Sequence, residues 1–149
     1  MSSNYKKFTC NCVCEMVRFI YDLQEEGACN KERVLSCDNV RPNTRPFVLY
    51  TSQGSLFQTF FPSLEENGCC SSSIFRVEEI DNCCAVLRVL AVIVCNVVQS
   101  NPIEAISHYM KPTETNSTRI VATSTCIVVN LSVFLGIQCL PDASLQAWG

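Results

Sequence analysis

The sequence predicts a mainly β protein: an antiparallel β-sandwich or curled sheet with one amphipathic helix at its N-terminal end. Three observations lead to this prediction. The most apolar stretch, residues 73–98, is rich in β-branched side chains. Other short apolar runs follow at close spacing and are separated by turn residues. A single helical pattern, at residues 12–26, precedes all of them.

The first expected element is the helix over residues 12–26. Asn11 is a suitable N-cap, and Gly27 is the expected stop. One side of this helix carries an apolar stripe. The simplest expectation is that the stripe packs on the sheet, and a contact with the helix of another subunit is the alternative. Apolar side chains at helical spacing form this stripe: Val13, Met16, Val17, Ile20 and Leu23.

The length of 149 residues fits one ordinary domain with a real core. We expect a flexible arm with cysteines at residues 1–11 and a single domain at residues 12–142. The β-rich part of that domain should cover residues 45–140. Residues 143–149 are then a tail.

After the helix, residues 27–46 are expected to form an irregular loop, because their two prolines disfavour a helix. Two apolar runs, residues 47–51 and 56–61, predict a β-hairpin around a short polar turn. Residues 63–73, with four serines and two cysteines, are expected to form another loop.

The apolar stretch that follows should form the centre of the sheet. A strand over residues 74–80 leads through a turn at residues 81–82 into a longer strand over residues 83–95. One face of the longer strand is wholly apolar, whereas Arg88 interrupts the other, so the second face should be only partly covered. A membrane helix is the rival interpretation, but the uncharged run after Arg88 is shorter than the roughly 20 residues that a span needs.

Toward the C-terminus, residues 101–117 should be a loop or a short helical turn that holds the only histidine, His108. A weak strand is expected at residues 118–122. The clearest period-two pattern covers residues 126–137, and Gly136 marks a bulge or bend in it. The expected core consists of Phe75, Val77, Leu87, Val89, Ile93, Val129, Leu131 and Ile137.

Composition and charge argue against several classes of function. The net charge is −3 and the basic residues are scattered, so no nucleic-acid partner is expected. One histidine without a nucleophile or carboxylate constellation gives little support for a hydrolase. Five dispersed glycines form no phosphate-binding loop. We therefore expect no enzymatic activity, no cofactor and no membrane insertion.

The cysteine content conflicts with the start of the chain. Twelve cysteines in 149 residues approach the composition of a disulfide or metal scaffold. Residues 8–15, however, do not form the apolar core of a secretory signal. The chain thus combines cysteines typical of an oxidised extracellular protein with synthesis in a reducing cytosol. Either the thiols bind metal, or the protein reaches an oxidising place without secretion.

Metal binding is the first alternative for these thiols. Cys10, Cys12 and Cys14 are close enough in sequence for thiolate ligation. Structural zinc sites, however, typically pair two Cys-x-x-Cys arms, and the sequence contains none. A cytosolic thiolate metal-binding module is therefore a secondary hypothesis with no assigned metal ligands. A small redox protein is a third, weakened by the same missing motif.

Disulfide cross-linking is the interpretation that the cysteine positions favour. Adjacent cysteines have α-carbons about 3.8 Å apart, whereas disulfides need roughly 4.4–6.8 Å, so the two Cys-Cys pairs should bond elsewhere. Cys83 should face the core, and Cys84 and Cys126 should face outward. Cys95 and Cys139 fit buried, inert cysteines. The candidates for intermolecular disulfides are Cys10, Cys12, Cys14, Cys69, Cys70, Cys84 and Cys126, and the other disulfide candidates are Cys29, Cys37, Cys83 and Cys139.

Four segments carry a resemblance to a known family: Thr44-Arg45-Pro46-Phe47-Val48-Leu49-Tyr50-Thr51, Ile74-Phe75-Arg76-Val77-Glu78, Cys84-Ala85-Val86-Leu87-Arg88-Val89-Leu90, and residues 123–140. They resemble, in order, the spore coat protein Y/Z family, the cysteine-rich outer-coat and exosporium proteins of endospore-forming bacilli. The resemblance extends from residue 10 to about residue 142. Phenylalanine-arginine-valine-glutamate followed by a cysteine-alanine strand is an unusual combination.

The resemblance implies a structural protein that self-assembles into two-dimensional arrays of hexameric units locked by intermolecular disulfides. It also implies other spore coat or exosporium proteins as partners. The expected location is the spore surface, after synthesis in the mother-cell cytoplasm without a secretory signal. The chain departs from the family pattern at Val133 and Leu135, where many members have cysteines, and it lacks a histidine-rich tail. These departures make an anchor for spore-surface filaments the alternative role.

Overall fold

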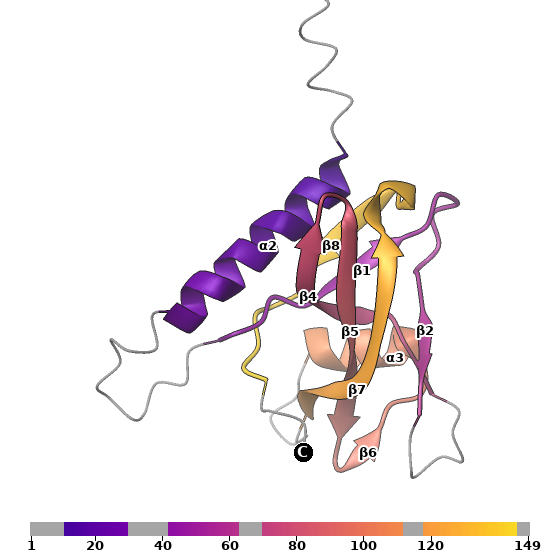
Figure 1. Ribbon diagram of the computed structural model, residues 1–149. Helices are drawn as coiled ribbons and strands as arrows, with labels where there is room; N and C mark the ends of the chain where they lie inside the picture. The colour runs from indigo at the N-terminus through magenta and orange to yellow at the C-terminus, as the bar shows by residue number, and fades with distance from the viewer. Residues whose placement is uncertain (1–10, 30–41, 63–69, 112–117, 146–149) are drawn as a thin grey trace, which may run out of the picture.

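The computed structural model describes residues 11–29, 42–62, 70–111 and 118–145. These residues form a mainly β fold in which the paired strands are antiparallel, as the sequence predicts. A second helix, where the sequence predicted a loop or a short helical turn, joins the N-terminal one in this part of the chain (Figure 1). In chain order the elements are α2 (Cys12–Cys29), β1 (Phe47–Tyr50), β2 (Thr59–Phe61), β3 (Cys70–Ser72), β4 (Ile74–Asp81), β5 (Cys84–Val94), β6 (Val97–Val98), α3 (Pro102–Met110), β7 (Thr118–Asn130), the 3-10 helix η2 (Leu131–Val133) and β8 (Gly136–Cys139).

Strand β5 is the centre of a six-stranded sheet with the order β6-β5-β4-β1-β8, and β7 pairs with β5. The turn at residues 82–83 joins β4 to β5, and Asn82 has the positive φ of 56° that such a turn tolerates in asparagine. The two predicted strands are therefore confirmed, with the turn one residue later than predicted and β5 one residue shorter at each end. Strand β6 pairs with Ile93 and Val94, beyond the part of β5 that β4 covers.

Helix α2 begins where the sequence predicts. The Asn11 side-chain oxygen accepts a hydrogen bond from the Cys14 backbone N–H at 2.9 Å and caps the first turn. The helix continues to Cys29, two residues beyond Gly27. Met16, which the predicted stripe included, is 39% exposed, because the buried stripe is rotated around the helix toward Cys14 and Gln24. The fully or nearly buried side chains of the helix are Val13, Cys14, Val17, Ile20 and Gln24.

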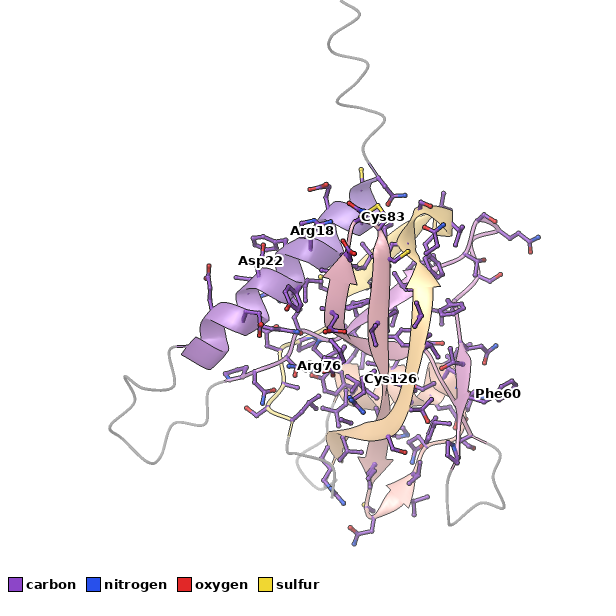
Figure 2. The ribbon with its side chains drawn as sticks, in the orientation of Figure 1. Arg18, Asp22, Phe60, Arg76, Cys83 and Cys126 are labelled. Atoms are coloured by element: carbon purple, nitrogen blue, oxygen red, sulfur yellow. A yellow bond between two sulfur atoms is a disulfide. The ribbon has the colours of Figure 1, made fainter. Side chains whose placement is uncertain are left out.

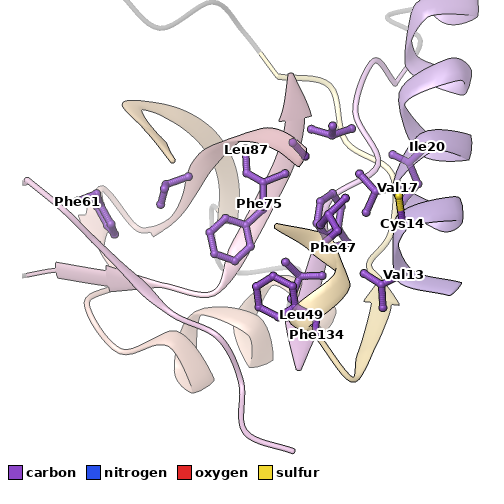
Figure 3. Packing of buried hydrophobic residues seen from close by; sticks show 14 of the residues in the cluster. Val13, Cys14, Val17, Ile20, Phe47, Leu49, Phe61, Phe75, Leu87 and Phe134 are labelled. Atoms are coloured by element: carbon purple, nitrogen blue, oxygen red, sulfur yellow. The ribbon is translucent and has the colours of Figure 1, made fainter. Parts of the chain in front are cut away.

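Alternate residues of β5 belong to two different cores, one on each face of the sheet. Figure 3 shows the first core, where Leu87 and Phe75 meet the buried stripe of α2. Phe57 stacks in this core against Phe75 and Phe134, with ring centroids 5.6 Å and 5.0 Å apart. Of the eight predicted core residues, six are buried, and Val129 and Ile137 are partly buried against the first core.

The second core lies under helix α3, which replaces the predicted loop or short helical turn. The Asn101 side-chain oxygen accepts hydrogen bonds from the N–H groups of Ile103 and Glu104 at 2.9 and 3.1 Å. Pro102 then opens the helix, where its missing N–H costs nothing. Asn101 and Pro102 therefore start a regular helix. The buried members of this core are Val48, Ile74, Leu90, Val92, Val94, Ala105, Ile120, Ala122 and Leu140.

The predicted hairpin of residues 47–51 and 56–61 forms only at its turn. Tyr50 and Leu56 make an isolated antiparallel bridge, after which the second run leaves the first. Strand β1 instead lies between β4 and β8. Strand β2 pairs with β3, which arises from the end of the stretch predicted as a loop. The prediction was wrong because each run finds a longer-range partner.

The clean alternation over residues 126–137 is divided by a turn. Strand β7 joins the predicted weak strand to the first half of this pattern and ends at Asn130, whose side chain accepts a hydrogen bond from the Ser132 N–H at 3.0 Å. Because β5 begins at Cys84, opposite Asn130, no residue of β5 is left to extend the ladder beyond this point. Val133 at the end of η2 and Leu135 are 58% and 68% exposed, whereas Phe134 between them is buried, against the predicted parity.

Candidate functional site

A disulfide joins Cys14 in the first turn of α2 to Cys83 at the β4–β5 turn (Figure 2). Their α-carbons are 5.3 Å apart, within the ordinary disulfide range. The Arg18 guanidinium, one helical turn later, donates to the Asn82 carbonyl at 2.6 Å. Cys14 was expected in a mobile region that cross-links neighbours. The structure corrects this placement, because Cys14 is 3% exposed and bonded within its own chain.

Cys70 also differs from its expected place in a loop. It opens β3, lies opposite Phe61 and is 1% exposed within the first core. A cysteine in this position acts as a small hydrophobic side chain. In the folded domain it is therefore out of reach of a neighbouring copy.

Cys84 and Cys126 face outward, as the strand alternation predicts, and both are exposed. They lie on the same face, because Cys84 pairs with Asn130 and Cys126 pairs with Arg88. Four residues of strand separate them, roughly 13 Å, so they cannot bond each other within one chain. Cys83 is half-buried and packs against the first core, as predicted. Whether the outward pair cross-links neighbours stays a prediction.

Cys95 and Cys139, predicted to be buried and inert, are both exposed. Strand β5 ends at Val94, and Cys95 enters a tight turn with φ of 50°, so strand parity no longer applies to it. Cys139 lies on β8, which pairs with β1 alone among the described strands. Desolvation raises the pKa of the Cys139 thiol; the positive charge of Arg45 opposes this shift, and Asp142 adds to it.

Of the five remaining cysteine candidates, one is exposed and four have side chains outside the part of the chain that the structure describes. Cys12 is exposed at the start of α2. On the same exposed side of the helix, Phe19 is 53% exposed. The other four candidates lie outside the described residues, in the case of Cys29 for its side chain only: Cys10, Cys29, Cys37 and Cys69.

Arg88, which the sequence shows only as an interruption, belongs to a polar network on the outward face. Glu78 accepts from Arg76 at 2.8 Å and from Arg88 at 3.0 Å. Arg88 also donates to the Thr123 carbonyl at 2.9 Å, and Arg76 donates to the Thr44 hydroxyl at 2.9 Å. The network therefore ties β4, β5 and β7 together beside Cys126. Its members were not recognisable in sequence, because a β-bulge at Val77/Glu79 brings Glu78 into position.

The described residues offer little for small-molecule chemistry. Within them, no three histidine, cysteine, aspartate or glutamate side chains gather as a metal site. A groove of about 130 Å³ lies beside α3, with apolar walls that include Leu56, Ile106 and Met110. Neither helix in the described ranges has the length and hydropathy of a membrane span.

Sequence similarity to known proteins identifies a family for this chain. The family model described as spore coat protein Z matches residues 1–142. The chain belongs to the spore coat protein Z family. It is 30% identical over 139 residues to spore coat protein Z of Bacillus subtilis (strain 168), covering 89% of this chain and 90% of that protein. No solved structure shows significant similarity to the chain.

Membership of the spore coat protein Z family confirms the resemblance seen in the sequence. It assigns the protein a structural role in the spore coat and a location at the spore surface. In this member of the family, the candidate site is thus a set of exposed cysteines on an internally bonded domain. Those described are Cys12, Cys84, Cys95, Cys126 and Cys139.

Proposed function

We propose that the protein builds a self-assembling layer of the spore surface, made of hexameric units that intermolecular disulfides lock into a two-dimensional array. The observation that carries this proposal is that the cysteines fall into two groups, one bonded within the chain and one exposed at the surface. One disulfide joins α2 to the sheet within the chain, while other cysteines are exposed on separate elements. These exposed cysteines are placed to reach neighbouring copies without opening the core.

Exposed apolar side chains support non-covalent contacts between copies. Phe60 on β2 is 79% exposed (Figure 2), and Val128 on β7 is 75% exposed. Val133 and Leu135, where the family resemblance expects cysteines, are exposed as well. In this chain, the surface around η2 thus offers apolar contacts in place of thiols. Contacts of this kind set the geometry that disulfides then secure.

The test is assembly of the purified full chain. Electron microscopy should show ordered arrays, and non-reducing gels should show oligomers that a reductant converts to monomer. Peptide mapping by mass spectrometry should find intermolecular bonds at Cys84 or Cys126. A protein that stays monomeric under oxidising conditions would contradict the proposal. If native mass spectrometry instead found stoichiometric zinc on a monomer, the protein would be a thiolate metal-binding module.

A further inference from the structure

The Cys14–Cys83 disulfide lies at an exposed tip of the molecule, and we propose that it is a reactive bond whose substrate is a cysteine thiolate of a second copy. Exchange at this bond would convert an internal disulfide into one between two chains. The inference rests on the proposed function, because it assigns a route by which assembled copies become cross-linked.

The two sulfurs of this bond differ in accessibility. Cys14 is 3% exposed, packed between α2 and the first core. Cys83 is only half-buried and lies at the β4–β5 turn, where Asp81, Asn82 and Cys84 are all exposed. An incoming thiolate therefore reaches the Cys83 sulfur, and the Cys14 sulfur becomes the leaving group.

The surroundings of Cys14 suit a leaving thiolate. It is the third residue of α2, and its own N–H is held by the Asn11 cap, so its sulfur lies near the positive end of an 18-residue helix. The Arg18 guanidinium is fixed 2.6 Å from the Asn82 carbonyl, beside Cys83. Helix N-termini and arginine both stabilise thiolates. Once protonated, the Cys14 thiol has the Asn82 carbonyl oxygen 3.1 Å away as a hydrogen-bond acceptor.

The exchange is balanced without an oxidant. The attacking cysteine loses its proton to water and forms a new bond to the Cys83 sulfur. The Cys14–Cys83 bond breaks, its electron pair remains on the Cys14 sulfur, and that thiolate takes up a proton. One thiol is consumed and one is released, so the total number of thiols is unchanged.

Among the described residues, the two exposed cysteines next to the bond in the sequence are poorly placed for this attack. Cys84 adjoins Cys83 but points to the opposite face of the strand. Cys12 lies two residues before Cys14, about 200° around the helix from it. These two exposed thiols therefore point away from the bond. A thiolate from a second copy has no such constraint.

The experiment uses the full chain with the Cys14–Cys83 bond intact and the other cysteines reduced. The protein is concentrated without oxygen and with a metal chelator. We expect intermolecular disulfides that contain Cys83, at a constant total thiol count. Cross-links that consume two thiols each, or that never contain Cys83, would overturn the proposal.

Variants at Arg18 and Asp81 test whether the charges around the bond control the rate of exchange. Arg18→Gln should slow anaerobic cross-linking about threefold, because leaving-group stabilisation is lost, and Arg18→Lys should largely restore the rate. Asp81→Asn should accelerate it, because a charge that repels the incoming thiolate is removed. Equal rates in all three variants would show that the local charges have no part in the reaction.

A double variant, Cys14→Ser with Cys83→Ser, removes the bond itself. We expect its anaerobic cross-linking to fall at least tenfold, while cross-linking under oxygen continues. If wild-type protein cross-links only under oxygen, the exchange is wrong and the proposed function stands. If neither condition yields cross-links or arrays, the proposed function fails as well. Far-UV circular dichroism checks that the double variant is folded.

Discussion

Gln24 joins three parts of the fold through one buried amide. Its Nε2 donates to the Val77 carbonyl at 3.0 Å, and its Oε1 accepts from the Arg45 N–H at 3.2 Å. Gln24→Ala removes both hydrogen bonds and leaves the Val77 carbonyl with only the Arg76 guanidinium, at 3.5 Å, so we expect a loss of about 1–3 kcal/mol in unfolding free energy. Urea denaturation measures this loss. Gln53→Ala, on an exposed turn, should change stability by less than about 0.5 kcal/mol.

Cys139 has a thiol whose reactivity should depend on its neighbours. Desolvation raises the pKa of this thiol. The charge of Arg45 lowers the pKa, and the charge of Asp142 raises it further. A raised pKa lowers the thiolate fraction near neutral pH, so alkylation by iodoacetamide should be slower than for a free cysteine. Asp142→Asn removes a negative charge, lowers the pKa and should accelerate labelling at pH 7.5. Glu104→Gln, on α3, is the control, and faster labelling there too would exclude a local effect.

At the scale of elements, the start of α3 depends on Asn101. Its side chain holds two of the first N–H groups of the helix, so Asn101→Ala should destabilise the protein by about 1 kcal/mol. Asn101→Asp keeps an acceptor and should be close to neutral. Thermal unfolding of the two variants makes the comparison. Equal losses in both would mean that Pro102 and packing alone define the helix start.

Local patterns predicted those elements whose pairing is also local. The turn at Asn82 places β4 and β5 side by side, so alternation correctly oriented Cys83 and Cys84. The alternation of apolar residues over 131–137 predicted a continuous strand, and this was wrong. Residues 131–133 form the 3-10 helix η2, although their apolar residues alternate as they would in a strand. The end of a strand depends on where its partner strand stops pairing. The β5–β7 pairing stops at Val94, so Cys95 leaves the strand and is exposed, not buried as predicted.

The candidate site was predictable to a similar extent. Outward cysteines within a strand could be recognised from parity alone, as Cys126 was. The Cys14–Cys83 bond spans 69 residues and exists because α2 crosses the sheet at the β4–β5 turn. No spacing in the sequence encodes that crossing. The burial of Cys70 likewise follows from the pairing of β3 with β2, which depends on the whole fold.

At the scale of the whole molecule, the first core holds both helical and strand elements together. Leu87 on β5 and Leu131 on η2 are both fully buried in it. Alanine at either position should cost on the order of 2–5 kcal/mol, from lost burial and the cavity left behind. Leu135→Ala, at a position 68% exposed, is the matched control. Losses below about half a kcal/mol at both buried sites would contradict this core.

Assembly should precede cross-linking. If random oxidation of many thiols came first, it would give amorphous aggregates, whereas an ordered layer needs non-covalent contacts that set the geometry. The chain exposes apolar side chains for such contacts, including Phe19, Phe60 and Val128. Heterologous contacts can close into rings, and contacts between rings extend a sheet. Disulfides then stabilise the array by restricting its dissociated and unfolded states.

The decisive variant keeps Cys14 and Cys83 and replaces the other cysteines by serine, so that the internal bond of the fold remains. We expect this variant to form rings or sheets at sufficient concentration, as seen by electron microscopy. Without intermolecular bonds, its arrays should dissociate in denaturant and on heating under conditions that wild-type arrays survive. A variant that stays monomeric at every concentration would mean that disulfides create the assembly. In that case, the exposed apolar side chains would contribute too little contact energy to order the layer, and oxidation would have to act on encounters between single molecules.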